Sequence, residues 1–200
     1  MDLGLAGLLV PEERGGAGAS AREAAVVMEE LGRFVAPVSF LTSAVVATIA
    51  LRGTNHEILD GLGAGQRTAA LTVPLHLSAF GFRATVRLDG EGRLYGAVAS
   101  VAGALDADVL VVPVRNGAGV ELHPVDVDGV GVTVEAVTSL DMTRQLADIV
   151  FTRADSTIVV AADAGDAAVR EALEVGAALL ASEQLGVAQW YSEPPRFVPA

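Results

Sequence analysis

The side chains that could do chemistry in this sequence are few and widely spaced. The three histidines, His56, His76 and His123, have no cysteine neighbours and form no i, i+4 pair, so a metal site has little support. The segment 126–129, Asp-Val-Asp-Gly, begins like a calcium loop but lacks the later acidic ligands, and a turn is the better interpretation. No serine lies in a Gly-x-Ser-x-Gly context, so hydrolase chemistry is not indicated.

Two glycine clusters have the composition of phosphate-binding loops. The cluster 61–65, Gly-x-Gly-x-Gly, ends a predicted helix and precedes a predicted strand, which reverses the order that a dinucleotide-binding loop needs. The cluster 15–18, Gly-Gly-Ala-Gly, precedes a helix N-terminus, where an anion can bind, but no strand leads into it. We interpret the first cluster as a loop and the second as a turn.

Composition and charge exclude several classes of protein. The 200 residues are 52% hydrophobic and 19% charged, which is enough apolar material for a packed core. The net charge of -12 leaves no basic surplus to displace counterions, so we expect no nucleic-acid partner. The absence of cysteine excludes disulfides and thiolate nucleophiles. We identify no secretion signal, and the longest apolar run, 38–51, is too short to span a bilayer, so we expect a cytoplasmic protein without membrane insertion.

Residues 1–65 are predicted to form a helical N-terminal domain. Ser20 and Glu23 form a capping box, in which each side chain can bond a backbone amide at the other end of the first turn. Apolar side chains then recur at helical spacing. The region predicts three helices: one over 20–32, one over 38–51, and one from a second capping box at Thr54–Glu57 to about Gly61.

Residues 66–160 are predicted to form a β-domain of short antiparallel strands, closed as a barrel or stacked as a sandwich. Val and Thr become frequent here, and turn residues separate short runs. The alternating run 83–88 and the run 93–96 flank Asp-Gly-Glu-Gly, which is a hairpin pattern. Further strands are predicted over 109–114, 119–123, 130–137 and 149–153.

Residues 161–200 are predicted to begin a C-terminal helical domain. One long helix is predicted over 166–191, and the prolines that follow cannot continue it. The residues expected to form one stripe along this helix are Val169, Leu173, Ala177, Leu180 and Gln184. Because no later helix covers it, we expect the isolated chain to expose an apolar face and to associate. The order of helices, β-domain and helix indicates an α+β fold and disfavours a Rossmann sheet.

Four strings of this sequence resemble, in order, segments of the acyl-CoA dehydrogenase family, and they span most of the chain. They are Pro11-Glu12-Glu13-Arg14-Gly15-Gly16-Ala17-Gly18, similar to PE-x-x-GG-x-G; Glu29-Glu30-Leu31-Gly32, similar to E-E-L-G; Leu140-Asp141-Met142-Thr143-Arg144, similar to LD-x-TR; and 178–186, similar to the first long helix of the family's C-terminal domain. The resemblance implies a helical N-terminal domain, a central β-domain and a C-terminal four-helix bundle.

The implied activity is α,β-desaturation of an acyl-CoA thioester. In the family a glutamate takes the α-proton while the β-hydrogen leaves as hydride to FAD, and the protein orients the two reactants. That glutamate belongs to the C-terminal bundle, beyond Ala200, so no residue of this sequence is assigned to catalysis and none to a metal. The resemblance also implies an acyl-CoA substrate and a homo- or hetero-oligomer with a related acyl-CoA dehydrogenase subunit.

The family's flavin strand, T-E-P-x-x-G-S-D, falls on residues 72–79. The cofactor-binding residues implied here are Leu71, Thr72 and Ser78, with the two hydroxyl residues bonding the flavin ring and phosphates. The pattern's Glu, Gly and Asp are replaced by Val73, Leu77 and Ala79. In the second flavin motif, G-x-K-x-W-x-T over 96–102, the tryptophan and the threonine are replaced by Ser100 and Ala102.

Three functions remain open from the sequence. The first is a flavin-dependent acyl-CoA dehydrogenase, of which this chain holds part of the acyl-CoA and flavin cleft. The second is a non-catalytic or degenerate subunit that docks on a full-length relative, motivated by the replaced flavin residues. The third is a β-domain that binds a ligand without any relation to flavin, which a closed barrel with a polar lumen would favour.

Overall fold

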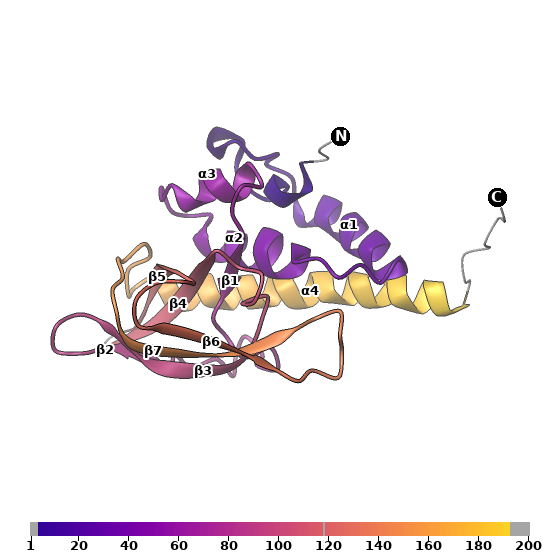
Figure 1. The fold of residues 1–200 in the computed structure, drawn as a ribbon. Helices are drawn as coiled ribbons and strands as arrows, with labels where there is room; N and C mark the ends of the chain where they lie inside the picture. The colour runs from indigo at the N-terminus through magenta and orange to yellow at the C-terminus, as the bar shows by residue number, and fades with distance from the viewer. Residues whose placement is uncertain (1–3, 118, 193–200) are drawn as a thin grey trace.

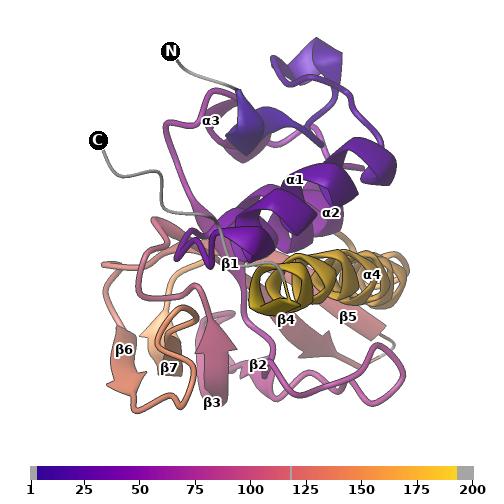
Figure 2. The same cartoon turned by 90° about the vertical axis from the view of Figure 1, so that its right-hand side faces the viewer.

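The helices and the sheet form two layers. The computed structural model describes residues 4–117 and 119–192, and the prolines predicted to stop the long helix lie outside these ranges. Figure 1 shows the N-terminal helices and α4 (Gly165–Ser192) on one side of a β-sheet. Figure 2 shows α4 between the other helices and the sheet. This arrangement confirms the predicted α+β class.

The N-terminal helices follow the predicted order. They are η1 (Leu5–Gly7), η2 (Glu12–Arg14), α1 (Ala21–Arg33), η3 (Phe40–Ala47), α2 (Thr48–Leu51) and α3 (Ile58–Gly63). The capping box that begins α1 is confirmed: the backbone N–H of Ser20 donates to Glu23 Oε2 at 2.8 Å, and Ser20 Oγ accepts from Arg22 N at 3.2 Å. These bonds satisfy amides that the first helical turn leaves without an intrahelical acceptor.

The apolar run 38–51 is helical and largely buried, as predicted, but most of it is a π-helix, η3, that continues into α2. Its polar residues have structural roles. Ser43 Oγ accepts from the backbone N–H of Ala69 at 3.0 Å, and Thr48 Oγ1 donates to Ser43 O at 3.0 Å. The first bond joins η3 to strand β1 (Ala69–Leu71). No helix within the described ranges is long and apolar enough to cross a bilayer.

The second predicted capping box is wrong. Helix α3 begins at Ile58, and no side chain caps it. Thr54 Oγ1 instead accepts from His56 N at 3.4 Å, and His56 Nδ1 accepts from Ile58 N at 3.3 Å. The pattern predicted a helix start one turn early because Thr side chains stabilise tight turns as readily as helix ends.

The sheet has seven strands within the described ranges. They are β1, β2 (Val86–Leu88), β3 (Leu94–Ala102), β4 (Val109–Asn116), β5 (Gly119–Asp126), β6 (Val132–Val137) and β7 (Leu146–Ala154). The order is β1-β4-β2-β3-β7-β6, and β5 also pairs with β4. The predicted hairpin is confirmed, because β2 and β3 are antiparallel with Leu88 opposite Leu94. The turn predicted over 126–129 is confirmed by a bond from Gly129 N to Asp126 O of 3.0 Å.

The predicted antiparallel barrel is wrong in two respects. The sheet is mixed, because β1 and β2 both run parallel to β4. It is also open. The free edge of β5 pairs with the segment that leads into α4, where Leu122 N donates to Val160 O at 3.0 Å, so this edge is not available to close a barrel. An open sheet with helices packed on it does not favour the ligand-binding barrel that the sequence left open.

The sheet has a hydrophobic core on each face. Val109 and Val111 of β4 pack with the helices in the first core, whereas Leu110, Val112 and Val114 belong to the second. Successive side chains of a strand point to opposite faces, and both faces of β4 are covered. The continuous apolar run predicted as a strand over 109–114 therefore reflects burial on both sides.

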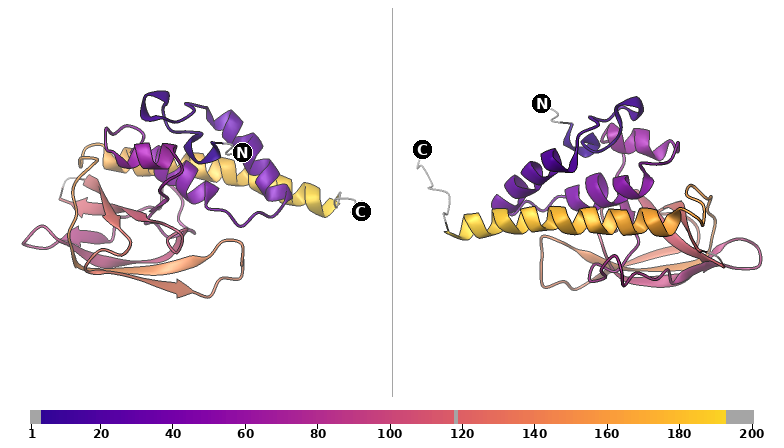
Figure 3. Two further views of the ribbon diagram at one scale, coloured as in Figure 1. Left: turned by 45° about the horizontal axis from the view of Figure 1, so that its top comes forward. Right: turned by 180° about the vertical axis from the view of Figure 1, so that it is seen from behind.

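The long helix is confirmed as α4, and its predicted stripe is right only in part: Val169 is buried, and Leu173 and Leu180 pack against the first core. The residues it buries are Gly165, Val169, Ala172, Gly176, Leu179 and Gly186. Ala177 and Gln184 of the predicted stripe are exposed. Figure 3 shows α1 crossing α4, and the crossing is close: a Cβ at Gly32 would lie 2.0 Å from Glu183 O, and one at Gly186 would lie 1.9 Å from Glu29 O. Backbone contact needs glycine, so the buried face includes small residues as well as the apolar Val169 and Leu179.

Candidate functional site

The two segments singled out as flavin motifs lie side by side. Thr72 N donates to Val111 O at 2.9 Å, which extends the β1 ladder by one residue, and the chain then bends. Pro74 pairs with Val101 of β3, and Leu75 N donates to Ser100 O at 3.0 Å. The structure therefore brings residues 72–75 against the middle of the 96–102 segment, 25 residues later in the chain.

Leu71 and Thr72 are buried, with 4% and 2% of their surfaces exposed. Leu71 packs in the first core. Thr72 Oγ1 is enclosed and has no hydrogen-bond partner among the described residues. A buried hydroxyl without a partner costs about 1–3 kcal/mol, so this atom is a hydrogen-bonding group that the chain itself leaves unused.

Ser78 occupies a different environment. It is exposed, and its Oγ and carbonyl oxygen both accept from Gly81 N, at 3.2 and 3.0 Å. The hydroxyl proton is still free to donate. Ser78 therefore holds a turn and presents a hydroxyl at the surface, whereas Thr72 lies inside.

Ser100 marks an irregularity in β3. The β3–β7 register shifts between Val98 and Val101, and Ser100 has φ 57°, which is unusual for a residue with a side chain. Its N–H donates to Asp148 Oδ1 of β7 at 2.8 Å. A bulge redirects side chains and is frequent beside functional sites. Asp148 could not be predicted from the sequence, because nothing in a local pattern identifies the partner of a bulge on another strand.

These residues do not make a complete flavin site. A flavin bound beside these residues needs hydrogen-bond donors and acceptors for its ring and phosphates and a flat side chain against the ring. The unpartnered hydroxyl of Thr72 can serve as one of these hydrogen-bonding groups. Ser100 and Ala102 offer no aromatic surface, and Val73 and Leu77 offer no polar side chain.

A second polar cluster lies on β5, on the face of the second core. His123 Nε2 lies 3.2 Å from Glu121 Oε2, and its Nδ1 lies 2.8 Å from Ser156 Oγ. Asn116 Nδ2 donates to Glu121 Oε1 at 2.6 Å. Burial lowers the pKa of His123 below its usual 6.5, against the opposing effect of Glu121.

The hydrogen bonds define the state of this imidazole. A neutral His123 carries one proton, and the carboxylate of Glu121 can only accept, so the proton is on Nε2. Nδ1 then accepts from the hydroxyl of Ser156. Each polar atom of the buried ring has a partner, which indicates a structural network. No group of three or more His, Asp or Glu in the described part of the chain is arranged to hold a metal ion.

Comparison with known proteins gives concordant matches. Residues 1–58 match the family model described as acyl-CoA dehydrogenase, N-terminal domain. The acyl-CoA dehydrogenase IpdE2 of Mycolicibacterium smegmatis is 30% identical over 186 residues, which cover 93% of this chain and 47% of that protein. The chain thus spans about half the length of this curated relative.

Solved structures match nearly the whole chain. A variant of the Tcur3481–Tcur3483 steroid acyl-CoA dehydrogenase superposes with a TM-score of 0.77 and 27% identity, covering 98% of this chain and 56% of that one. A glutaryl-coenzyme A dehydrogenase in complex with glutaryl-CoA superposes with a TM-score of 0.79 at 17% identity, covering 98% of this chain and 57% of that one. The second likeness concerns the fold alone.

Proposed function

Because the chain belongs to the acyl-CoA dehydrogenase family, we propose that it forms part of the acyl-CoA and flavin cleft of an enzyme that desaturates acyl-CoA thioesters at the α,β bond. The oxidant of the reaction is FAD, and the substrate is an acyl-CoA. We propose this activity for an assembly that contains the chain, in which groups other than the residues described here also contact FAD and the acyl-CoA. We expect this assembly to work in the cytoplasm, which cell fractionation tests.

The observation that carries the proposal is the bond from Leu75 N to Ser100 O. It joins the two segments that resemble flavin motifs, the one that follows β1 and the one in β3. The unpartnered hydroxyl of Thr72 lies three residues before this bond. An unused buried hydroxyl beside these joined segments supports a role in holding a ligand, because native proteins rarely leave such groups unpaired.

We assign three residues to this site. Thr72 donates or accepts through Oγ1, and Leu71, packed in the first core, fixes the backbone that carries it. Ser78 presents its hydroxyl from the exposed turn. The bond between Ser100 N and Asp148 holds the facing strand in its irregular shape.

Flavin binding by the purified chain tests the proposal. The chain is mixed with FAD, unbound flavin is removed, and flavin absorbance and acyl-CoA desaturation with an artificial electron acceptor are measured. Wild-type protein should retain flavin, and Thr72→Val, which keeps the shape and removes the hydroxyl, should retain several-fold less. A wild-type chain that stays colourless would reject the flavin role for this chain, whether or not it desaturates acyl-CoA.

A second candidate is a non-catalytic subunit that docks on a full-length relative. It is favoured by two replacements in the second flavin motif. Ser100 stands at the tryptophan position and offers no aromatic side chain, and Ala102 stands at the threonine position and offers no hydroxyl. Co-expression with a full-length acyl-CoA dehydrogenase distinguishes the two. A stable complex whose flavin content depends on the relative supports the subunit, and a monodisperse monomer beside an unbound relative argues against it.

A further inference from the structure

The polar network on β5 has an order that a structural link does not require. The hydroxyl of Ser156 lies 2.8 Å from Nδ1 of His123, and Nε2 of the same ring lies 3.2 Å from Oε2 of Glu121. The other oxygen of this carboxylate accepts from Asn116 Nδ2 at 2.6 Å. A hydroxyl, an imidazole and a carboxylate in series form the arrangement in which an enzyme activates a weakly nucleophilic serine. No local motif marks the series, because His123 precedes Ser156 by 33 residues.

The protons of this series lie where nucleophilic attack needs them. The carboxylate of Glu121 can only accept, so Nε2 of His123 donates to it and Nδ1 accepts from the hydroxyl of Ser156. Burial lowers the pKa of His123 below its usual 6.5, so the ring is neutral and able to accept a proton at pH 7. Glu121 acts against the effect of burial and therefore stabilises the imidazolium that forms when Ser156 loses its proton.

Of the three side chains in the series, the serine is the accessible one. The side chains of His123 and Glu121 are only 3% and 7% exposed. Ser156 is half-buried, and its neighbours Asp155 and Thr157 are exposed. The fold therefore keeps water away from the base and the carboxylate while leaving the hydroxyl within reach of a small molecule.

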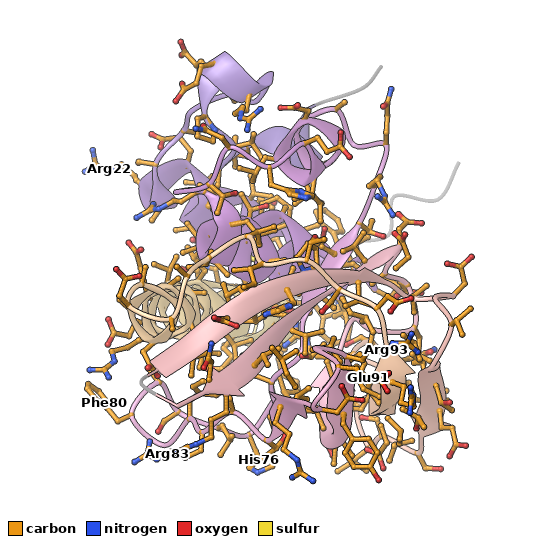
Figure 4. The ribbon with its side chains drawn as sticks, turned by 90° about the vertical axis from the view of Figure 1, so that its left-hand side faces the viewer. Arg22, His76, Phe80, Arg83, Glu91 and Arg93 are labelled. Atoms are coloured by element: carbon orange, nitrogen blue, oxygen red, sulfur yellow. The ribbon has the colours of Figure 1, made fainter. Side chains whose placement is uncertain are left out.

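The segment that carries Ser156 is held on both sides. Before it, Asp155 Oδ1 lies 3.5 Å from Arg93 Nε, and Figure 4 shows Arg93 beside Glu91 at one side of the molecule. After it, the segment pairs with the edge of β5 through Val160. Because both flanks are attached, the hydroxyl is oriented against the imidazole before any substrate arrives, and such orientation lowers the barrier to reaction.

Hydrogen-bond donors and space for a substrate lie next to this hydroxyl. Within the described residues, the backbone N–H groups of Ser156 and Thr157 have no acceptor, so they can bond the oxyanion that develops on a substrate carbonyl. Thr157 also lines a cavity of about 430 Å³. Three carboxylates and one arginine line the same cavity, so a neutral or cationic molecule suits it better than an anion.

We propose that Ser156 is an activated serine that takes an acyl group from small esters without negative charge. Its Oγ bonds to the carbonyl carbon, and the bond from that carbon to the leaving oxygen breaks. The proton passes from the hydroxyl to Nδ1 of His123 and from there to the leaving oxygen. The products are an ester of Ser156 and a free alcohol or phenol, so the reaction needs no oxidant and no cofactor.

Acetylation by p-nitrophenyl acetate, an uncharged ester, tests this reaction on the full chain without flavin. Release of p-nitrophenolate gives the rate, and mass spectrometry of proteolytic peptides locates the acetyl group. The sequence contains neither lysine nor cysteine, so no side-chain amine or thiol competes. Ser139 is the matched internal control, because it is also half-buried and follows a strand, and its hydroxyl has no histidine partner among the described residues.

Ser156 should carry the acetyl group, and Ser139 should stay unmodified. Ser156→Ala should abolish the acetylation of this peptide, and His123→Gln should slow it about a hundredfold or more, as expected for loss of a general base. Circular dichroism checks that each variant is folded. Acetylation of Ser156 no faster than that of Ser139 in the wild-type chain would overturn the proposal, and so would an unchanged rate in a folded His123→Gln variant.

Discussion

Arg144 donates from a single guanidinium nitrogen to both carboxylate oxygens of Glu183, at 2.8 and 2.7 Å. Both side chains are mostly buried, with 17% and 19% of their surfaces exposed. Arg144 ends the LD-x-TR string and Glu183 lies in the string on α4, so the pair joins two segments that resemble the same family. This contact attaches the loop that precedes β7 to the long helix α4.

Loss of this pair should destabilise the chain. Glu183→Gln removes the negative charge and leaves Arg144 partly buried without a counter-charge, and we expect the free energy of unfolding to fall by about 1–2 kcal/mol. Urea unfolding measures it. The matched control is Glu171→Gln, which breaks the exposed pair with Arg52 and should cost about 0.5 kcal/mol or less. Equal losses in the two variants would contradict the structural role of Arg144–Glu183.

The crossing of α1 and α4 should not tolerate a methyl group. Gly186→Ala would place Cβ 1.9 Å from Glu29 O, and we expect a loss of about 2–4 kcal/mol, although alanine favours a helix over glycine. The thermal unfolding midpoint measures it. Gly53→Ala, where a Cβ meets nothing within 4 Å, is the control and should change stability little. A neutral or stabilising Gly186→Ala would show that the helices do not approach so closely.

The buried imidazole of His123 should make stability depend on pH. Burial lowers its folded-state pKa below the usual 6.5, so below pH 6.5 the unfolded chain takes up a proton that the folded chain resists. The contribution of this group to stability is complete above pH 6.5 and falls as the pH decreases below that value. His123→Gln should lose this part of the pH dependence of the unfolding midpoint, whereas the exposed His76→Gln should retain it. Identical pH profiles for wild type and His123→Gln would refute the assignment.

The orphan hydroxyl of Thr72 should cost stability in the chain alone. Thr72→Val removes a buried polar atom without a partner, and we expect the free energy of unfolding to rise by about 1 kcal/mol. Thr48→Val is the opposite case, because the hydroxyl of Thr48 is bonded to Ser43 O, and it should lower stability. If Thr72→Val also lowers stability in the absence of ligand, its hydroxyl has a partner within the chain.

Apolar side chains around the ends of α1 and α4 should make the isolated chain associate. Phe34 is 70% exposed, Leu185 51% and Tyr191 84%. Clusters of large exposed apolar side chains bind hydrophobic dyes and other surfaces. We expect dye fluorescence and a concentration-dependent elution volume in gel filtration, and Tyr191→Ser should reduce both. A monomer at all concentrations, without dye binding, would show that this surface is too small to drive association.

Much of the local structure follows from the sequence alone. The capping box at Ser20 and Glu23, the continuous apolar strand over 109–114 and the long helix over 166–191 are all predicted correctly, because each depends on hydrogen bonds or side-chain patterns within a short segment. The order of the four segments that resemble acyl-CoA dehydrogenases indicates this family from the sequence alone. The division into 1–65, 66–160 and 161–200, and the flavin roles of Leu71, Thr72 and Ser78, stay predictions.

The tertiary structure alone decided which surfaces meet. The sheet stays open because Val160, a residue outside any named strand, takes the edge of β5. The buried face of α4 includes Gly186, where α1 crosses in backbone contact, as well as the apolar Val169 and Leu179. The motif made Thr72 a candidate, and the tertiary structure added that its buried hydroxyl has no partner among the described residues. In each case the deciding contact joins residues far apart in the chain, and the free energy of such contacts depends on distances that short-range sequence patterns do not encode.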